Sequence, residues 1–266
     1  MSKTENTWLD PEKRQEQIER PGGSAFFGYE RIARKDKNQR VRQHFESIAT
    51  QYDFMNTLLS FGIHYAWKRQ AVRMMNLQPG QIVLDVCGGT GDLALMSAAR
   101  VGTNGQVIVY DINRAMLEAG RKKIASSNMA SRITMVQGNA EEISFSHGYF
   151  DAAIVSFGIR NVTDMKQGFR EMHRVLKPGG KMMCLEFSKP TNPLFCWLYD
   201  LYSFHIMPFL GELIVGSRKA YTHLPETIRM FPLPDELAAI LYRIGFPDIT
   251  YRRFTNGIAV AHLAVK

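Results

Sequence analysis

The chain has 266 residues, of which 45% are hydrophobic and 22% are charged, and its formal net charge at pH 7 is +8. This size and composition are typical of a soluble globule that buries a large core, as one α/β domain with appendages or as two small domains. The three cysteines, Cys87, Cys184 and Cys196, have no metal-binding or disulfide spacing. This excludes a disulfide framework or a cysteine metal site, and it predicts reduced thiols in a cytosolic setting.

Two segments precede the first apolar strand. Residues 1–24 are polar, lack the apolar run of a signal peptide and close on Pro21-Gly22-Gly23-Ser24, so we expect a flexible lead. Apolar residues recur at helical spacing over 38–55 and over 65–75, which predicts one helix in each range and a helical cap over 25–78. Six basic residues against one acid between Arg31 and Arg42 suit an anionic membrane surface or a nucleic-acid backbone, and equally a solvated helix start.

From residue 79 to the end, apolar runs alternate with amphipathic ones. Strands are expected at 81–86, 106–111, 132–137, 151–156 and 181–187, with helices at 92–100, 114–126 and 164–176 between them. Because each expected strand is apolar throughout, both faces of the sheet must be covered, which predicts an α/β fold with a mostly parallel, doubly wound sheet. Ligands of such sheets bind beyond the carboxyl ends of the strands.

The segment 190–231 interrupts the alternation with eight aromatic residues. Its apolar stretch 194–215 approaches membrane-spanning length, but Asp200, His205, Pro208 and Glu212 within it argue against a span. Either an apolar lid or pocket wall that touches a bilayer, or an ordinary pair of core helices, fits this composition.

The C-terminal part of the chain is expected to close the sheet. A helix should begin at Pro234 and end near Arg243, and two apolar runs follow at 248–254 and 258–265. The Thr255-Asn256-Gly257 connection between them is a strong hairpin signal. The parallel sheet is therefore expected to end in an antiparallel hairpin.

A glycine-rich turn organises the expected sheet. The strand 81–86 contains Asp85 and leads through Gly88, Gly89 and Gly91 into a helix, the pattern of a strand that turns sharply toward a ligand. Asp111 ends the next strand, 20 positions after Gly91, where a carboxylate can bind a nucleoside ribose. Because Gly89-x-Gly91-x-x-Ala94 also fits the dinucleotide fingerprint, these residues predict a nucleoside cofactor without identifying it.

Several further stretches resemble one known family. Tyr52-Asp53-Phe54-Met55-Asn56, Ser60-Phe61-Gly62-Ile63-His64, Ser156-Phe157-Gly158-Ile159-Arg160-Asn161-Val162 and Glu186-Phe187-Ser188-Lys189-Pro190 occur in this order. With the glycine loop, they are similar to the C-methyltransferases of ubiquinone and menaquinone biosynthesis, which have the Rossmann-like class I fold and use S-adenosylmethionine. The resemblance covers roughly 26–266. The long polar lead and Cys87, where a small residue is common in the family, depart from its pattern.

The resemblance implies further cofactor contacts beside Asp85 and the three glycines, namely Thr90, Asp111, Asn139, Ala140 and Ser156. Asp111 can accept both ribose hydroxyls, since a carboxylate accepts charge-assisted hydrogen bonds. Without the family, Asn139 also fits an Asx turn at a strand end, and Ser156 a plain strand-end hydroxyl.

The implied reaction is C-methylation of the ring of a polyprenyl quinol, either demethylmenaquinol or 2-polyprenyl-6-methoxy-1,4-benzoquinol. Phenolic groups titrate near pH 10, so a positioned base or base-linked water is expected. We place Arg160, Asn161 and Tyr52 at the substrate, with Arg160 holding a phenolate or orienting water, because an arginine cannot act as a base at neutral pH. His64 and His205 are weaker candidates, since a lone histidine is more often structural.

The expected partners follow from this substrate. The quinol tail should lie along the aromatic segment 190–231, and a cytoplasmic protein with peripheral contact at the inner face of the membrane is expected. Neither nucleic acid nor a metal ion is expected as a ligand. A homo-oligomer and a quinone-biosynthesis complex both stay open.

Four other functions compete with this interpretation. The glycine fingerprint alone fits an NAD(P)-dependent oxidoreductase, and the +8 charge fits a nucleic-acid methyltransferase. Ser156-Phe157-Gly158, however, differs from the tetrad of amino-methylating DNA enzymes. A membrane-surface scaffold would use the basic patch and the aromatic segment without catalysis. A methyltransferase acting on another lipid or a small aromatic molecule would use the same cofactor site.

Overall fold

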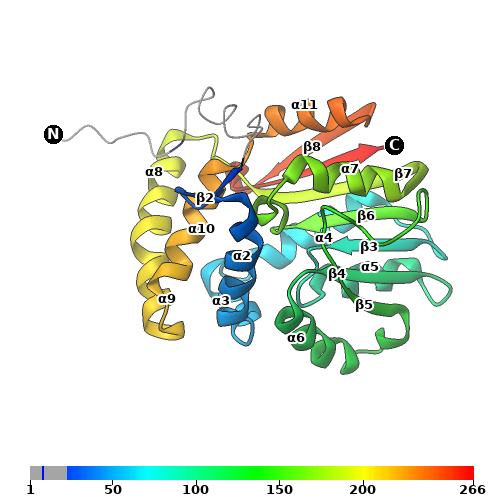
Figure 1. The fold of residues 1–266 in the computed structure, drawn as a ribbon, viewed down its shortest axis with the longest axis horizontal. Helices are drawn as coiled ribbons and strands as arrows, with labels where there is room; N and C mark the ends of the chain where they lie inside the picture. Colours follow the sequence, from blue (N-terminus) through cyan, green and yellow to red (C-terminus); the bar gives the residue numbers. More distant parts are fainter. Residues whose placement is uncertain (1–7, 9–22) are drawn as a thin grey trace.

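A seven-stranded sheet forms the centre of the protein in the computed structural model, which describes Trp8 and residues 23–266 (Figure 1). The strand order is β5-β4-β3-β6-β7-β9-β8. The first five strands in this order pair in parallel, and β9 pairs antiparallel to β7 and to β8. The strands are β3 (Ile82–Val86), β4 (Gln106–Asp111), β5 (Ile133–Gln137), β6 (Phe150–Ser156), β7 (Leu176–Phe187), β8 (Asp248–Phe254) and β9 (Ala259–Val265). The expected parallel sheet and its terminal hairpin are confirmed.

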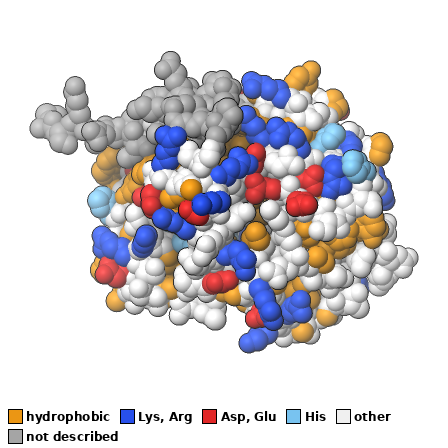
Figure 2. Space-filling model, in the orientation of Figure 1, with side chains coloured by type: hydrophobic (Ala, Val, Ile, Leu, Met, Phe, Trp, Pro, Cys, Tyr) orange, Lys and Arg blue, Asp and Glu red, His pale blue; other side chains and the backbone are white. Residues whose placement is uncertain are grey.

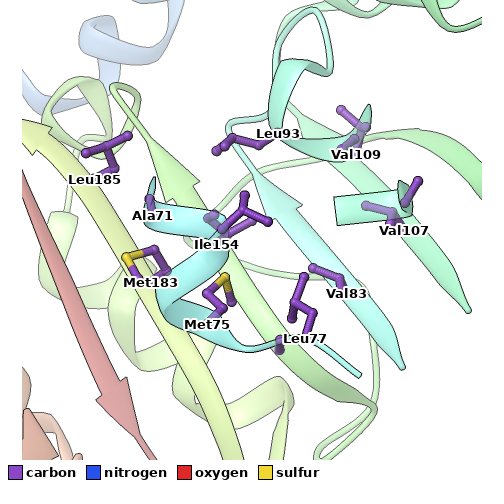
Figure 3. Close-up of a cluster of buried hydrophobic side chains, with 14 of the residues drawn as sticks. Ala71, Met75, Leu77, Val83, Leu93, Val107, Val109, Ile154, Met183 and Leu185 are labelled. Carbon is purple, nitrogen blue, oxygen red and sulfur yellow. The ribbon is translucent and has the colours of Figure 1, made fainter. Parts of the chain in front are cut away.

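Helices cover both faces of this sheet because neighbouring residues of each strand point to opposite sides. In β6, Ile154 joins one buried cluster and Val155 the other. The first cluster lies under α4 (Ile63–Met75), α5 (Asp92–Val101) and α6 (Arg114–Ala125). Figure 3 shows Ala71 and Met75 of α4 packed toward Val83 and Ile154 of the sheet. The second cluster lies under α7 (Met165–Val175) and α11 (Pro234–Ile244), so the central strands β3, β4 and β6 are largely apolar, as expected.

The N-terminal cap differs from its prediction. A two-stranded antiparallel sheet of β1 (Ser24–Phe27) and β2 (Glu30–Ala33) comes first and was not expected. The single helix predicted over 38–55 is wrong: the chain forms α2 (Arg34–Ile48) and then α3 (Tyr52–Leu59). The apolar period runs through both helices, whereas the backbone leaves helical geometry at Gln51, with φ −111° and ψ 2°. The break redirects α3 toward the glycine loop. The lead predicted over 1–24 lies mostly outside the described residues.

The segment after β7 forms a helical layer beside α2 and α3 (Figure 1). It consists of α8 (Pro193–Leu201), the π-helical turn η3 (Tyr202–Ile206), α9 (Met207–Val215) and α10 (Arg218–Met230). A third buried cluster joins this layer to the cap, with Met55 and Leu59 of α3 against Met207 and Tyr221. Short 3-10 turns occur at η1 (Ala130–Arg132), η2 (Ile159–Asn161) and η4 (Thr255–Gly257). No helix within the described part of the chain is long and apolar enough to cross a membrane.

The basic segment at the start of α2 is partly used inside the protein. Arg34 forms an ion pair with Asp164 at 2.9 Å, and Arg40 pairs with Glu30 at 2.8 Å. The Lys37 ammonium is buried and donates to a backbone carbonyl at 3.0 Å. Figure 2 accordingly shows Lys and Arg side chains interspersed with Asp and Glu on this face, and a uniform basic patch is absent from it.

Candidate active site

A cavity that is lined by polar as well as apolar side chains, and that we call the polar cavity, opens at the carboxyl ends of β3, β4 and β6. This is where the strand order reverses, since β4 and β5 lie to one side of β3 and β6 lies to the other. The loops after β3 and β6 approach closely: a side chain on Gly158 would begin 2.4 Å from the Cβ of Cys87. Predicted cofactor residues that line the cavity are Asp85, Gly88, Gly89, Thr90, Asp111, Asn139, Ala140 and Ser156. Gly91, at φ 80°, instead forms the N-cap of α5 behind it.

Buried polar atoms without partners mark this cavity as a ligand site. Both carboxyl oxygens of Asp85, the Ser156 hydroxyl and the Asn161 amide nitrogen are buried without a well-formed hydrogen bond among the described residues, although the Ala94 amide lies close enough to Asp85 to lower its pKa. Burial raises the pKa of Asp85 to about 8, although the Lys68 ammonium and the Ala94 amide oppose the rise. Because unpaired buried polar groups are costly, these atoms fit the expected cofactor, which carries a sulfonium and an ammonium group.

Asp111 is held in place by the glycine loop and by its own turn. Its Oδ2 accepts the Gly89 amide at 2.9 Å, and its Oδ1 accepts the Asn113 amide at 2.8 Å. Burial raises the pKa of Asp111 to about 6, against these two backbone hydrogen bonds. The carboxylate still has lone pairs free on both oxygens, so it can accept the two hydroxyls of a ribose. Asn139 makes the Asx turn that the sequence left open, accepting the Glu141 amide at 3.0 Å, and it also lines the cavity.

A charged network that the sequence did not predict closes one side of the cavity. The Thr90 hydroxyl donates to Asp53 Oδ1 at 2.7 Å, and Lys123 of α6 donates to Asp53 Oδ2 at 2.8 Å. Lys123 also pairs with Asp92, whose other oxygen accepts Lys68 at 2.7 Å. Burial alone would raise the pKa of Asp92, but the charges of Lys68 and Lys123 lower it to about 2. Asp53 is the second residue of the stretch 52–56 that resembles the family. Nothing in the sequence indicated that Lys123 of α6 would be its partner.

A second cavity, whose lining is mostly apolar and which we call the apolar cavity, adjoins the first. It lies between the cap, η2 and the helices α8, η3, α9 and α10. The residues that line both cavities are Phe45, Tyr52, Phe157 and Asn161. Aromatic side chains from the segment 190–231 line the second cavity, namely Phe195, Tyr199, Tyr202 and Tyr221. This segment therefore forms a pocket wall, one of the two alternatives that its composition left open.

The three predicted substrate residues lie around the boundary between the cavities. Tyr52 begins α3, and Asn161 ends η2 with its side chain buried. Arg160 lines the apolar cavity, where its guanidinium donates to Glu186 at 3.0 Å and to the Phe157 carbonyl. Glu186 is itself buried, and burial raises its pKa while the Arg160 charge lowers it. Arg160 is thus a buried cation whose charge is largely matched.

Of the two weaker histidine candidates, one lies at a cavity and the other does not. His64 lines the apolar cavity, contacts the Thr57 hydroxyl at 3.4 Å and has its pKa lowered to about 4 by burial and by Lys68. His205 lies exposed on η3 and lines neither cavity. Two other histidines, His44 and His223, line the apolar cavity and were not predicted.

The three cysteines, Cys87, Cys184 and Cys196, are free thiols, and burial raises the pKa of Cys87 well above its usual value.

Fold and cavity together define a class I S-adenosylmethionine-dependent methyltransferase. One solved structure with this fold is an S-adenosylmethionine-dependent methyltransferase from Thermotoga maritima, described as a possible histamine N-methyltransferase. It superposes with a TM-score of 0.59 at 19% identity, over 84% of this chain and 99% of that one. Within the class, residues 33–266 match the model of the ubiE/COQ5 methyltransferase family. The chain belongs to this family.

Two curated relatives are similar over nearly their whole length, and both are named ubiquinone/menaquinone biosynthesis C-methyltransferase UbiE. The protein of Ectopseudomonas mendocina is 42% identical over 257 residues, which is 97% of this chain and 99% of the relative. The protein of Serratia proteamaculans is 44% identical over 248 residues, which is 93% of this chain and 99% of the relative. The family uses S-adenosylmethionine, so the interpretation of the chain as a dinucleotide-dependent oxidoreductase is set aside.

Proposed function

We propose that the protein transfers the methyl group of S-adenosylmethionine to a ring carbon of a polyprenyl quinol, in menaquinone or ubiquinone biosynthesis. The observation that carries the proposal is the pair of adjoining cavities. One is polar, with unpaired buried carboxyl, hydroxyl and amide groups, and the other is apolar and aromatic. Such a pair suits a charged nucleoside on one side and a lipid ring on the other.

In this proposal, the polar cavity binds and orients the cofactor, which supplies an electrophilic methyl group when bound. Asp111 accepts the ribose hydroxyls, and Asp85, whose pKa burial raises to about 8, releases its proton when a positive group of the cofactor binds against it. Ser156 and Asn161 end the strand and the turn that face the boundary, so their free polar atoms lie beside the reacting centre. Most of the acceleration then comes from alignment of the two reactants across the boundary.

The apolar cavity must favour the ionised form of the quinol, since the ring attacks best as a phenolate. Arg160 is the cationic residue that lines this cavity, and its buried charge can stabilise a developing phenolate oxygen in a low-dielectric setting. Glu186 holds the guanidinium from behind and lines neither cavity, so it positions Arg160. Tyr52 and Asn161 are placed to order a water molecule that accepts the phenolic proton.

The direct test is to incubate the purified protein with labelled S-adenosylmethionine and each reduced quinol, and to identify the product by mass. Arg160→Ala should reduce turnover at least tenfold while the dissociation constant of the cofactor stays unchanged, because Arg160 lies outside the polar cavity. Unchanged quinol methylation by this variant would exclude the proposed role of Arg160. Methylation of another lipid or a small aromatic molecule, with none of the quinols, would refute the proposed substrate.

The proposal includes peripheral contact with a membrane. Of the fifteen large hydrophobic side chains that are exposed in the described part of the chain, twelve lie on α3, the turn after it, the first residue of α4, and the segment from α8 through η3 to α9. We call these twelve the apolar face: Phe54, Leu58, Phe61, Ile63, Leu194, Phe195, Trp197, Leu198, Leu201, Ile206, Phe209 and Leu213. Four of them, Phe61, Ile63, Phe195 and Leu198, also line the apolar cavity. A large exposed apolar patch marks an interaction surface, and continuity with the cavity favours a lipid surface that delivers the quinol.

Substitutions outside the cavity test this contact. Phe209→Ser with Leu213→Ser removes two exposed members of the apolar face, 57% and 70% exposed. The variant should lose flotation with lipid vesicles and turnover of a long-tailed quinol, yet keep turnover of a short-tailed quinol in solution. Tyr242→Ser, 67% exposed on α11, is the matched control. Normal flotation of the double variant would contradict the membrane contact. If the variant floats normally but changes from an oligomer to a monomer, the apolar face is instead the contact surface of a homo-oligomer.

We divide the chain accordingly. Residues 25–78 act as a cap, residues 79–266 as the methyltransferase domain, and the insertion 190–231 as the wall that selects the substrate. The cap supplies Phe45 and Tyr52 to the boundary between the cavities, so cap and domain are required together for a complete site.

A further inference from the structure

Two histidines that come from distant parts of the chain meet at the apolar cavity. His44 lies on α2 and His223 on α10, and their ring centroids are 4.9 Å apart. Phe27 of β1 stacks on His223 at 3.9 Å and meets His44 edge-on at 6.1 Å. Both histidines line the apolar cavity and also a shallower groove on the outside. The pair therefore forms the wall between the cavity and the surface.

Several other polar groups of this cavity are already engaged, although the Asn161 amide nitrogen is not. The Tyr202 hydroxyl donates to the Leu59 carbonyl at 2.7 Å, and the Thr255 hydroxyl accepts the Trp67 indole at 2.9 Å. The Thr227 hydroxyl donates to the Leu224 carbonyl at 2.8 Å. By contrast, neither imidazole ring of the pair has a hydrogen-bonding partner among Trp8 and residues 23–266. Polar atoms left free in an apolar cavity indicate a ligand that carries a matching polar atom.

Protonation decides what the pair can do. Burial, with the Arg160 charge, lowers the pKa of His44 to about 4. Burial, His44 and the charges of Arg160, Lys37 and Lys219 lower the pKa of His223 to about 3. Both rings are therefore neutral at pH 7, and each has one N–H donor and one acceptor nitrogen. Taking a proton fully from a phenol would be roughly six pK units uphill, so the pair suits hydrogen bonding and not general-base catalysis.

We infer that His44 and His223 hydrogen-bond one ring oxygen of the quinol and thereby fix which ring carbon faces the cofactor. The inference rests on the proposed function. Phe45, which follows His44 and lines both cavities, connects this polar end of the cavity to the boundary. A ring anchored by one oxygen at the histidine pair presents a defined edge toward Asn161. A ring without that oxygen would leave the histidine nitrogens on the cavity side without a partner, which lowers affinity.

Binding measurements on paired ligands test this inference. Dissociation constants are measured in the presence of S-adenosylhomocysteine for a short-tailed quinol and for its two mono-hydroxy analogues, each lacking one ring oxygen. The wild-type protein should bind one analogue about tenfold more weakly than the quinol, and it should tolerate loss of the other oxygen. His44→Phe and His223→Phe should bind the quinol about tenfold more weakly and no longer distinguish it from the sensitive analogue. His223→Gln, which keeps an amide donor and acceptor, should recover part of the discrimination.

Controls separate the possible failures. His205→Phe makes the same chemical change on exposed η3 and should leave all dissociation constants unchanged. Equal weakening of the quinol and both analogues in the His44 and His223 variants would overturn the inference, since that result indicates lost packing alone. Wild-type methylation of the quinol is measured in parallel. If it is absent, the proposed function fails; if it is present without discrimination between analogues, only the histidine inference fails.

Discussion

Asp85→Asn should make the cofactor-free protein more stable and abolish its affinity for S-adenosylmethionine. The folded pKa of Asp85 is about 8 and the usual value is 3.8. A carboxyl whose folded pKa is raised costs stability above its unfolded pKa, and this cost grows as the pH rises toward the folded pKa. At pH 7 the solution is 3.2 pH units above the usual pKa of 3.8, so keeping Asp85 protonated in the folded protein costs about 4 kcal/mol of stability, at 1.36 kcal/mol per unit. This is a large share of the stability of a typical domain.

Urea unfolding of both proteins at pH 5 and pH 8 measures this cost. The stability advantage of Asp85→Asn should widen by about 4 kcal/mol between these pH values, because only the wild type must protonate a buried carboxyl. Comparison across pH cancels the constant effect of the buried amide. Asp248→Asn, at an exposed position at the start of β8, is the matched control. A pH-independent difference, or cofactor binding as tight as in the wild type, would refute the reasoning.

Three further outcomes follow from the site. Asp111 has its pKa raised to about 6 by burial, so cofactor affinity measured by calorimetry should fall as the pH drops below 6, and Asp111→Asn should flatten this dependence. Arg160→Met leaves Glu186 buried and unpaired and should destabilise the fold by about 3–5 kcal/mol; adding Glu186→Gln should restore the denaturation midpoint but not turnover. Asp53→Asn weakens the contacts to α6 and the glycine loop, and it should speed cofactor release several-fold in stopped-flow experiments, while the free energy of unfolding changes by less than about 2 kcal/mol.

The strands of the sheet were predicted well because the residue types within one strand already show whether its two faces are buried. In β3 and β6, the residues inside the strand are apolar except for Asp85 and Asp151, since both faces are covered, and this local pattern needs no knowledge of neighbours. The Asn256 turn is also local, because its positive φ of 56° follows from the residue types. The start of β7 at Leu176 was missed: Lys177-Pro178-Gly179-Gly180 suggests a helix stop, yet the chain there pairs irregularly with β6.

Contacts between distant segments could not be predicted in the same way. Asp53 and Lys123 are 70 positions apart, and their meeting depends on how α3 and α6 dock. His44 and His223 come together only through the packing of α2 against α10. For Asp85 and Asp111, the strand-end position was sufficient to place both at the cavity. It did not show that Asp111 accepts two backbone amides whereas neither oxygen of Asp85 has a well-formed hydrogen bond.

The shared boundary of Phe45, Tyr52, Phe157 and Asn161 has a consequence for inhibitor chemistry. Because the two cavities adjoin along it, one covalently linked molecule can occupy both, with an adenosyl group in one and an apolar aromatic group in the other. Linking converts the second binding event into an intramolecular one, which can raise affinity by roughly 10²–10⁴ when the linker spans the sites. The linker has to span only the distance between the cofactor sulfur and the ring carbon that receives the methyl group. Bisubstrate compounds with short linkers should therefore bind more tightly than those with long linkers.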